Sequence, residues 1–372
     1  MKNKIFTTIF ALILALISIG TILLPKKDFS DNENRVLATF PEFSWASLKD
    51  GTFTSGISDY FTDHMIFRDG WVTIKTSVEK LVGKHESGGI QVLKNGMLTQ
   101  SFTQVDLEGA LEKISCFSEF ETLLKEKSGI DAVTIVSPTA TQIYEDLTYA
   151  DCNNANTEEF FTRANAEIKG FIDLNEVLTE HRDEELFYRT DHHWTYLGAY
   201  YAYVEYCKVA GFDALTLEEL DIETVTDEFF GTTYSRYGFF DGKNPDTVKT
   251  VSADKLKNTV VTLKGETHSG IFYPEKLEGK DKYLYFLGGN EAITEVDTGL
   301  STGRTLVLVK DSYANSLLPY LCFHFDKIIL IDLRYYPRDV YSCVEQYGAT
   351  DVLVMYNLGS INESQAELLP LE

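Results

Sequence analysis

Basic side chains are scarce in this 372-residue chain, in which 33 Lys and Arg residues stand against 57 Asp and Glu residues. The formal charge is −24, and residues 1–24 contain two lysines and no acid, so the remainder carries −26. Binding to nucleic acid or to an anionic lipid surface requires clustered cations. The shortage therefore argues against a nucleic-acid partner and favours a neutral or cationic one.

Cysteine is also rare, with five residues scattered along the chain and no CxxC pair. This absence argues against a zinc ribbon and against a thioredoxin-type redox motif. Because the number is odd, at least one thiol stays free in the monomer. We expect Cys207, Cys322 and Cys343, which lie in apolar contexts, to be small core residues.

Long hydrophobic runs are limited to residues 5–24, which contain no charge and follow Lys2 and Lys4. A helix of this length spans a bilayer. The residues before Pro25 form a poor cleavage site for a signal peptidase. We expect residues 1–24 to be an uncleaved membrane anchor, with a cleaved signal peptide as the alternative. The rest of the chain would then lie outside the cytoplasmic membrane.

Residues 25–88 are expected to form a linker followed by a small helical region. Apolar positions recur at helical spacing from Phe53 onward and again after Asp69. The turn between them, residues 63–69, is interpreted as a helix–turn–helix connection, with a place on the active-site rim as the alternative. A hairpin follows over residues 89–100, and Asn95-Gly96 favours a type I′ turn.

The remainder, residues 89–372, has the pattern of an α/β domain. Continuous apolar segments at residues 131–136, 305–309, 327–332 and 351–356 alternate with helical patterns. Such alternation predicts a parallel sheet with right-handed crossovers. Residues 212–300 are less regular and are interpreted as an inserted, partly β lobe.

The stretch Asp191-His192-His193-Trp194 concentrates chemistry in a chain that has seven His and three Trp residues. An Asp two residues before a His can orient that imidazole as a base. It can also be half of a metal site. The other histidines are isolated, so we expect no metal and no other cofactor, with a structural histidine pair as a further alternative. Trp194 is expected to begin a helix that extends to residue 210.

Ser312 is the candidate nucleophile, because it follows an apolar strand directly and opens a helix. Free N–H groups and the positive end of the helix dipole favour an oxyanion there. The alternative is that Asp311 or Ser312 only caps the helix. In a triad, Asp191 would hold one nitrogen of His193 and His193 would take the proton of Ser312. Adjacent side chains in a turn diverge, so His192 is expected to face elsewhere.

The segment from Asp191 to Trp194 resembles the signature of the DHHW family, a branch of the SGNH-hydrolase-like proteins related to alginate O-acetylation proteins. Further segments spread over nearly the whole chain look like motifs of the same family. They are Asn34-Arg35-Val36-Leu37, Asp63-His64, Phe67-Arg68-Asp69, Phe286-Leu287-Gly288-Gly289-Asn290, Lys310-Asp311-Ser312-Tyr313-Ala314-Asn315 and Asp332-Leu333-Arg334-Tyr335-Tyr336.

This resemblance implies a flavodoxin-like SGNH-hydrolase-type three-layer sandwich with a parallel central sheet, in which the Asp and His precede the Ser in a permuted motif order. The triad would be Ser312, His193 and Asp191. The resemblance also implies residues of an oxyanion or substrate region, namely Tyr313, Arg334, Tyr335, Asn290 and Asn315. Related proteins move acetyl groups onto exported polysaccharides, often with a membrane-bound acyl-transfer partner.

Three hypotheses about function follow. The first is an extracytoplasmic enzyme that acts on acyl esters, either an O-acetyltransferase for an exported polysaccharide or cell-surface glycan, or an acetylesterase. The second is a non-catalytic glycan-binding or assembly protein on the same fold, since 21 Tyr and 24 Phe could stack on sugars. The third is a manganese phosphoesterase, which would require further Asp-rich metal motifs.

Overall fold

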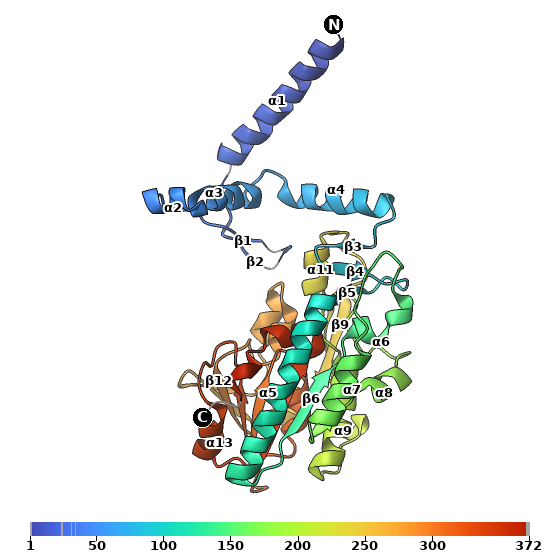
Figure 1. Ribbon diagram of the computed structural model, residues 1–372, viewed down its shortest axis with the longest axis vertical. Coiled ribbons are helices and arrows are strands. Elements are labelled where there is room, and N and C mark those ends of the chain that lie inside the picture. Colours follow the sequence, from blue (N-terminus) through green and yellow to red (C-terminus); the bar gives the residue numbers. More distant parts are fainter. Residues whose placement is uncertain (1, 24, 31, 34, 370–372) are drawn as a thin grey trace.

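A computed structural model describes residues 2–23, 25–30, 32–33 and 35–369 of the chain. Figure 1 shows three parts along its long axis: an N-terminal helix that rises away from the rest, a set of helices across its base, and an α/β domain. Residues 1, 24, 31, 34 and 370–372 lie outside the described part, so Asn34 of the first motif is not placed.

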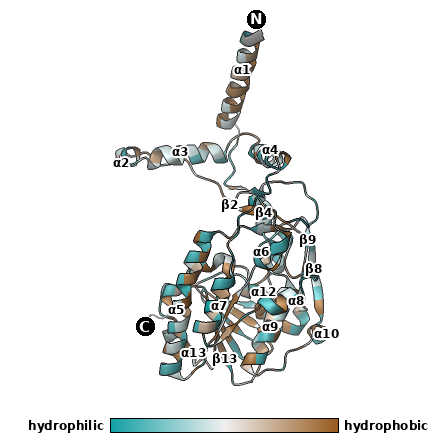
Figure 2. Cartoon of the chain, turned by 45° about the vertical axis from the view of Figure 1, so that its right-hand side comes forward, coloured by the Kyte–Doolittle hydropathy of each residue, from teal (hydrophilic) through white to brown (hydrophobic). Residues whose placement is uncertain are grey.

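The N-terminal part contains four helices. The first, α1 (Lys2–Leu23), is the one described helix long and apolar enough to cross a membrane, and Figure 2 shows its hydrophobic colouring along its length. After it come the short paired strands β1 (Phe29–Ser30) and β2 (Arg35–Val36). The helices α2 (Trp45–Lys49), α3 (Thr52–Asp63) and α4 (Arg68–Leu81) follow.

The domain is built on one eight-stranded mixed sheet, with the strand order β11-β10-β12-β14-β13-β15-β6-β7. The five strands from β14 to β7 run parallel, while β12, β10 and β11 are added antiparallel at one edge. The strands are β6 (Val133–Ser137), β7 (Phe171–Ile172), β10 (Val260–Leu263), β11 (Glu266–Ser269), β12 (Ile293–Asp297), β13 (Thr305–Lys310), β14 (Lys327–Ile331) and β15 (Asp351–Asn357).

Helices cover both faces of this sheet, which gives three layers. On β13, Leu306 and Leu308 belong to one apolar core, whereas Val307 and Val309 belong to the other. This alternation follows from the two-residue period of a strand. The first core packs under α8 (Asn175–Glu180), α9 (Tyr196–Ala210) and α12 (Ala314–Leu321), and the second under α5 (Gln104–Ser128), α7 (Glu158–Glu167) and α13 (Val340–Tyr347).

Smaller elements complete the domain. One small sheet consists of β3 (Glu86–Ser87), β4 (Ile90–Val92) and β5 (Leu98–Gln100), and β8 (Ile222–Phe229) pairs with β9 (Asp246–Val251). The short helices are α6 (Ala140–Ile143), α10 (Leu217–Leu220) and α11 (Thr232–Tyr237), and the 3-10 turns are η1 (Glu145–Leu147), η2 (Ala253–Leu256), η3 (Pro274–Glu278), η4 (Lys282–Tyr285), η5 (Leu358–Glu363) and η6 (Ala366–Leu368).

Two expectations differ from the structure. The hairpin between β4 and β5 forms, but its loop contains three residues between Leu93 and Met97, and only Gly96 has a positive φ, 82°. A type I′ turn needs a positive φ at both central residues, so Asn95-Gly96 does not form one. Residues 212–300 are also not a wholly separate lobe, because β10, β11 and β12 extend the central sheet.

Candidate active site

Ser312 lies at the carboxyl edge of the central sheet, in the turn from β13 to α12. The buried carboxylate of Asp311 fixes this turn, because Oδ1 accepts the N–H of Tyr313 at 2.8 Å and Oδ2 accepts the N–H of Asn357 at 2.7 Å. The ends of β13 and β15 are thereby tied together. Ser312 remains partly exposed, at the edge where open α/β sheets bind their ligands.

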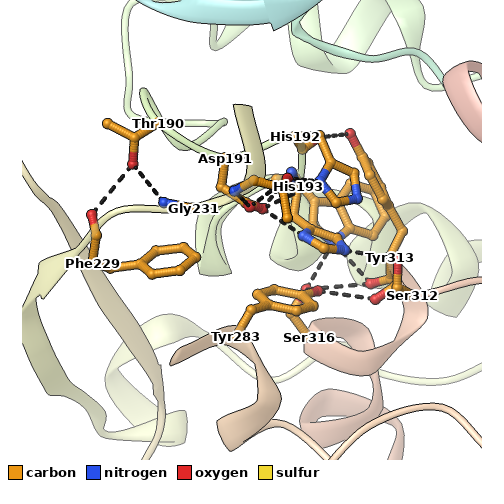
Figure 3. A network of polar contacts seen from close by, with 12 residues as sticks. Thr190, Asp191, His192, His193, Phe229, Gly231, Tyr283, Ser312, Tyr313 and Ser316 are labelled. Carbon is orange, nitrogen blue, oxygen red and sulfur yellow. Dashed lines mark hydrogen bonds and ion pairs between the residues drawn. The ribbon is translucent and has the colours of Figure 1, made fainter. Parts of the chain in front are cut away.

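Asp191, His193 and Ser312 form one chain of hydrogen bonds (Figure 3). His193 Nε2 lies 2.8 Å from Ser312 Oγ, and His193 Nδ1 lies 2.5 Å from Asp191 Oδ1. Since Asp191 accepts the proton on Nδ1, Nε2 is the nitrogen left to accept the hydroxyl proton. The structure therefore brings the Asp191–His193 pair against Ser312, which lies 119 positions after His193 in the sequence.

Asp191 is 3% exposed and is held on its other side by the start of α11. Its Oδ2 accepts the backbone N–H of Thr232 at 2.8 Å and the Thr232 hydroxyl at 2.9 Å. Burial opposes ionisation, but the charges of His192 and His193 and their hydrogen bonds hold the pKa of Asp191 well below its usual value. The carboxylate is therefore ionised and can orient His193.

His193 is 4% exposed and lies against two rings. The ring of Tyr283 stacks on it at 3.7 Å between centroids, and the ring of His192 lies 3.8 Å away. Burial and the charge of His192 lower the pKa of His193 to about 4, against the opposing pull of Asp191. His193 is consequently neutral near pH 7, which is the state in which it can accept a proton.

His192 bonds away from Ser312, with its Nδ1 2.6 Å from Thr232 Oγ1. Ligand atoms of Asp191, His192 and His193 lie within 4.8 Å of one another, the one such cluster among the described residues. Hydrogen bonds within the protein already engage both Asp191 oxygens, both ring nitrogens of His193 and one nitrogen of His192. This donor set fits an oriented base better than a transition-metal site, which uses three or four convergent ligands.

Trp194 and Tyr313 support the site through hydrogen bonds. Trp194 Nε1 donates to the carbonyl oxygen of Tyr313 at 3.0 Å and to Ser316 Oγ at 2.8 Å, and the Tyr313 hydroxyl donates to the carbonyl oxygen of His192 at 2.6 Å. Tyr313 is fully buried, so it braces the histidine segment and does not line an open substrate surface. Trp194 does not begin a helix, since Thr195 caps α9, which starts at Tyr196.

A buried lysine lies next to the turn that contains Ser312. Lys310 is 1% exposed and donates to Asn290 Oδ1 at 2.7 Å and to Asn315 Oδ1 at 2.6 Å. Because an ammonium group only donates, both amides must turn their oxygens toward it. Asn315 Nδ2 bonds to Asn290 Oδ1 at 3.2 Å. The amide nitrogen of Asn290 therefore points away from Lys310, as a donor beside the nucleophile segment.

Arg334 and Tyr335 follow β14 and differ in position. Arg334 makes a two-point ion pair with the buried Asp332, with contacts of 2.9 and 2.6 Å. Its charge also contributes to lowering the pKa of His193, which indicates that it lies near the site. Tyr335 is 55% exposed and lines a separate hollow with Ile293 and Tyr347.

The sequence matches the model of the family described as DHHW protein over residues 33–95 and 108–331. The chain belongs to the DHHW family. A crystal structure of a DHHW family protein from Eubacterium siraeum is 25% identical over 76% of this chain and 95% of that one, with a TM-score of 0.63. A comparison with curated proteins finds no match.

Two other solved structures are more distant. PatB1 of Bacillus cereus, solved with a sulfonyl adduct, is 17% identical over 73% of this chain and 97% of that one, with a TM-score of 0.59. The likeness to PatB1 shows a shared fold. The O-acetyltransferase domain of Pseudomonas putida AlgJ is 12% identical over 76% of this chain and 93% of that one, with a TM-score of 0.42.

The DHHW-like motifs near the N-terminus serve a different part of the molecule. Asp63 accepts hydrogen bonds from Arg35 Nη1 at 2.9 Å and from the backbone N–H of Ala38 at 2.8 Å, and Arg68 Nε lies 3.7 Å away. This ionic cluster joins β2, α3 and the start of α4. The turn at residues 63–69 therefore belongs to the base of α1, and the structure does not place it on the rim of the Ser312 site.

Sequence reasoning missed three residues that touch the chain of hydrogen bonds or its support: Thr232, Tyr283 and Lys310. Thr232 and Tyr283 lie in residues 212–300, which the sequence presents as an insertion. A usable signal was Gly231, because a Cβ at this position would lie 2.3 Å from Asp191 Oδ2. A glycine between aromatic residues and hydroxyl residues marks a close approach of this kind.

Proposed function

We propose that this protein is an extracytoplasmic enzyme of acyl-ester chemistry, with Ser312 as nucleophile, His193 as base and Asp191 as the residue that orients it. The observation that carries the proposal is the continuous hydrogen-bond chain from Asp191 Oδ1 through both nitrogens of His193 to Ser312 Oγ. The low pKa of His193 supports it, because the base is unprotonated near pH 7.

In the first half of the reaction, Ser312 Oγ attacks the carbonyl carbon of an acetyl ester while its proton passes to His193 Nε2. The carbonyl oxygen becomes an oxyanion, which the first N–H groups of α12 and the amide nitrogen of Asn290 are proposed to stabilise. When the ester bond breaks, His193 returns the proton to the leaving alcohol. The acetyl group is left on Ser312.

In the second half, a hydroxyl group takes the place of the leaving alcohol. It loses its proton to His193 Nε2 and attacks the acetyl carbon, and the proton then returns to Ser312 Oγ. A sugar hydroxyl gives O-acetyl transfer and water gives hydrolysis. We propose a polysaccharide or cell-surface glycan as the acceptor, with a membrane-bound acyltransferase as the partner that supplies acetyl groups and α1 as the membrane anchor.

The function is tested with the full-length protein in detergent and a chromogenic acetyl ester. Ser312→Ala should reduce turnover by several orders of magnitude, whereas Ser301→Ala, at an exposed serine before β13, should retain the activity. A sulfonyl fluoride should inactivate the wild type and add one sulfonyl group to the peptide that contains Ser312. Equal turnover by Ser312→Ala and the wild type would refute the assignment.

The same preparation separates the two other candidate functions. Binding of an acetylated oligosaccharide that persists in His193→Ala, with no ester turnover in the wild type, would assign the protein to glycan binding without catalysis. Turnover of a phosphoester that requires added manganese would assign it to the phosphoesterases.

A further inference from the structure

Helix α4 carries an apolar stripe that faces away from the protein. The stripe consists of Phe67, Trp71, Ile74, Val78 and Leu81, which are between 40% and 85% exposed. The spacing of three and four residues from Trp71 to Leu81 places these four side chains on one side of the helix, and Phe67 is the residue directly before its first turn. Five large apolar side chains in one exposed row are far more than the scattered exposure that is normal on a protein surface.

The opposite side of α4 is packed against the domain. The Thr76 hydroxyl, 1% exposed, donates to the carbonyl oxygen of Tyr237 at 3.2 Å, and Lys80 Nζ lies 4.0 Å from the ring of Phe239. Val72 lies so close to Gly238 that a Cβ there would be 2.6 Å from Val72 Cγ1. The polar side of this amphipathic helix is therefore the side in contact with protein.

The free side of α4 faces the direction in which α1 rises. Figure 1 shows α4 extending sideways from the lower end of α1, next to α3, with the domain on the side away from α1. A hydrogen bond ties α1 to the turn that precedes α4, because Thr21 Oγ1 accepts the N–H of Ile66 at 3.2 Å. The Trp71 indole nitrogen donates to the carbonyl oxygen of Ile66 at 3.0 Å. The stripe thus begins where the apolar span of α1 ends.

We propose that the stripe of α4 inserts into the boundary between headgroups and acyl chains of the bilayer that α1 crosses. This inference rests on the membrane anchorage included in the proposed function, but not on the catalytic assignment. α4 then lies in the plane of the membrane and holds the α/β domain at a fixed height and tilt above it.

The composition of α4 favours lipid over a second protein chain as the occupant. Phe67 and Trp71 begin the stripe, and aromatic rings are enriched at membrane interfaces. Amphipathic helices with a row of Trp, Phe and aliphatic side chains lie in the membrane interface with their apolar face buried.

The proposal is tested by quenching of Trp71 fluorescence in the full-length protein reconstituted into phosphatidylcholine vesicles. A Trp45→Phe background removes the other exposed indole, and the buried Trp194 serves as an internal reference. Lipids brominated near the headgroup end of the acyl chain should quench most of the Trp71 emission. Lipids brominated near the methyl end should quench less, and Trp45→Phe/Trp71→Phe should lose the quenched component altogether.

A matched pair of double variants tests whether the stripe is responsible for the quenching of Trp71. Ile74→Ser/Val78→Ser should reduce the quenching of Trp71, whereas Val105→Ser/Val209→Ser, at exposed valines on the domain, should leave it unchanged. Flotation with the vesicles reports insertion of α1, and turnover of a soluble ester reports the catalytic site. Insertion of α1, the depth of the stripe and catalysis are therefore measured separately.

Two results would overturn the proposal. In the first, the protein floats with the vesicles but Trp71 is quenched no more than Trp194. If this protein is also dimeric, the stripe contacts a second copy of the chain. In the second, the protein fails to float, which removes the membrane anchor itself. Loss of ester turnover alone would count against the proposed function and leave the quenching result standing.

Discussion

His193 combines a fixed position with a low affinity for protons. Its two ring nitrogens are committed to Asp191 and Ser312, and its ring is stacked on Tyr283. The neighbouring His192 has a raised pKa: burial opposes this shift, but the charge of Asp191 outweighs it. At a pH below its raised pKa, a protonated His192 therefore lies beside a neutral His193. In the proposed mechanism, His192 sets the pH range in which the base works.

This arrangement predicts that the acid limb of the pH–rate profile, where activity falls with falling pH, lies at unusually low pH. Because protonation of His193 removes the base, kcat/KM for a soluble ester should stay level from pH 7 to about 5 and fall as the pH passes through about 4. In His192→Gln, the loss of the neighbouring positive charge should raise the pKa of His193 and move the limb upward by on the order of one pH unit.

The pH–rate profile of the purified full-length protein checks this prediction. His181→Gln is the matched control, because His181 is a half-exposed histidine paired with Glu184 and it should leave the profile unchanged. Circular dichroism at each pH separates loss of activity from unfolding. If the acid limb of His192→Gln lies at the same pH as that of the wild type, or at a lower pH, the role assigned to His192 is wrong.

The sequence predicted Asp191, His193 and Ser312 as chemically paired residues, but it could not predict Lys310. Lysine is seldom fully buried, and its position at the end of a buried strand is visible only once β13 is placed in the middle of the sheet. Burial lowers the pKa of Lys310 to about 8, against the charges of Asp332 and Asp311. Its partners Asn290 and Asn315 come from two different segments, which no local pattern connects.

At the scale of elements, the strands and helices with strong periodicity were predictable. The apolar runs became β6, β13, β14 and β15 within one or two residues of the expected bounds. Short elements were not predictable, because α11 has only six residues and β8 has irregular pairing. Their conformation depends on tertiary contacts with residues such as Thr190, whose carbonyl oxygen accepts the N–H of Tyr234.

The start of α11 is the element on which the position of Asp191 depends. Gly231 lets the N-terminus of this helix approach the carboxylate, since a Cβ at Gly231 would lie 2.3 Å from both Cβ and Oδ2 of Asp191. Gly231→Ala should therefore displace Asp191 and reduce kcat by on the order of 10²-fold with a smaller change in KM. Steady-state kinetics with the chromogenic ester measures both constants.

Gly70→Ala is the control for this substitution, because no atom lies within 4 Å of a Cβ built on that helical glycine. It should leave kcat unchanged. Thermal unfolding of both variants shows whether either one has lost its fold. A Gly231→Ala protein that is folded and fully active would mean that the Asp191 pocket has more room than the structure indicates.

At the scale of the whole molecule, α1, the helices at its base and the α/β domain follow one another away from the proposed membrane. The sequence predicted this order, but not the packing of α4, because a helix with two contrasting faces does not reveal which face meets protein. The hydrogen bond of Thr76 with Tyr237 joins residues 161 positions apart. Only the assembled structure shows that the apolar face is the free one.

Charge is the property of the whole molecule that bears on the acceptor. Beyond residue 24 the chain carries −26, and the cations near the site are already engaged, Arg334 with Asp332 and Lys310 with two amides. An anionic polysaccharide should therefore be repelled during encounter.

With an acetylated uronate oligosaccharide, KM should fall several-fold when salt is raised until the Debye length is about 3 Å. KM for a neutral acetylated oligosaccharide should not change, and initial rates at low and high salt measure the difference. Turnover of the chromogenic ester at both salt concentrations shows whether salt alters the enzyme itself. If KM for the uronate substrate is lowest at low salt, the site attracts anions despite the negative charge of the chain.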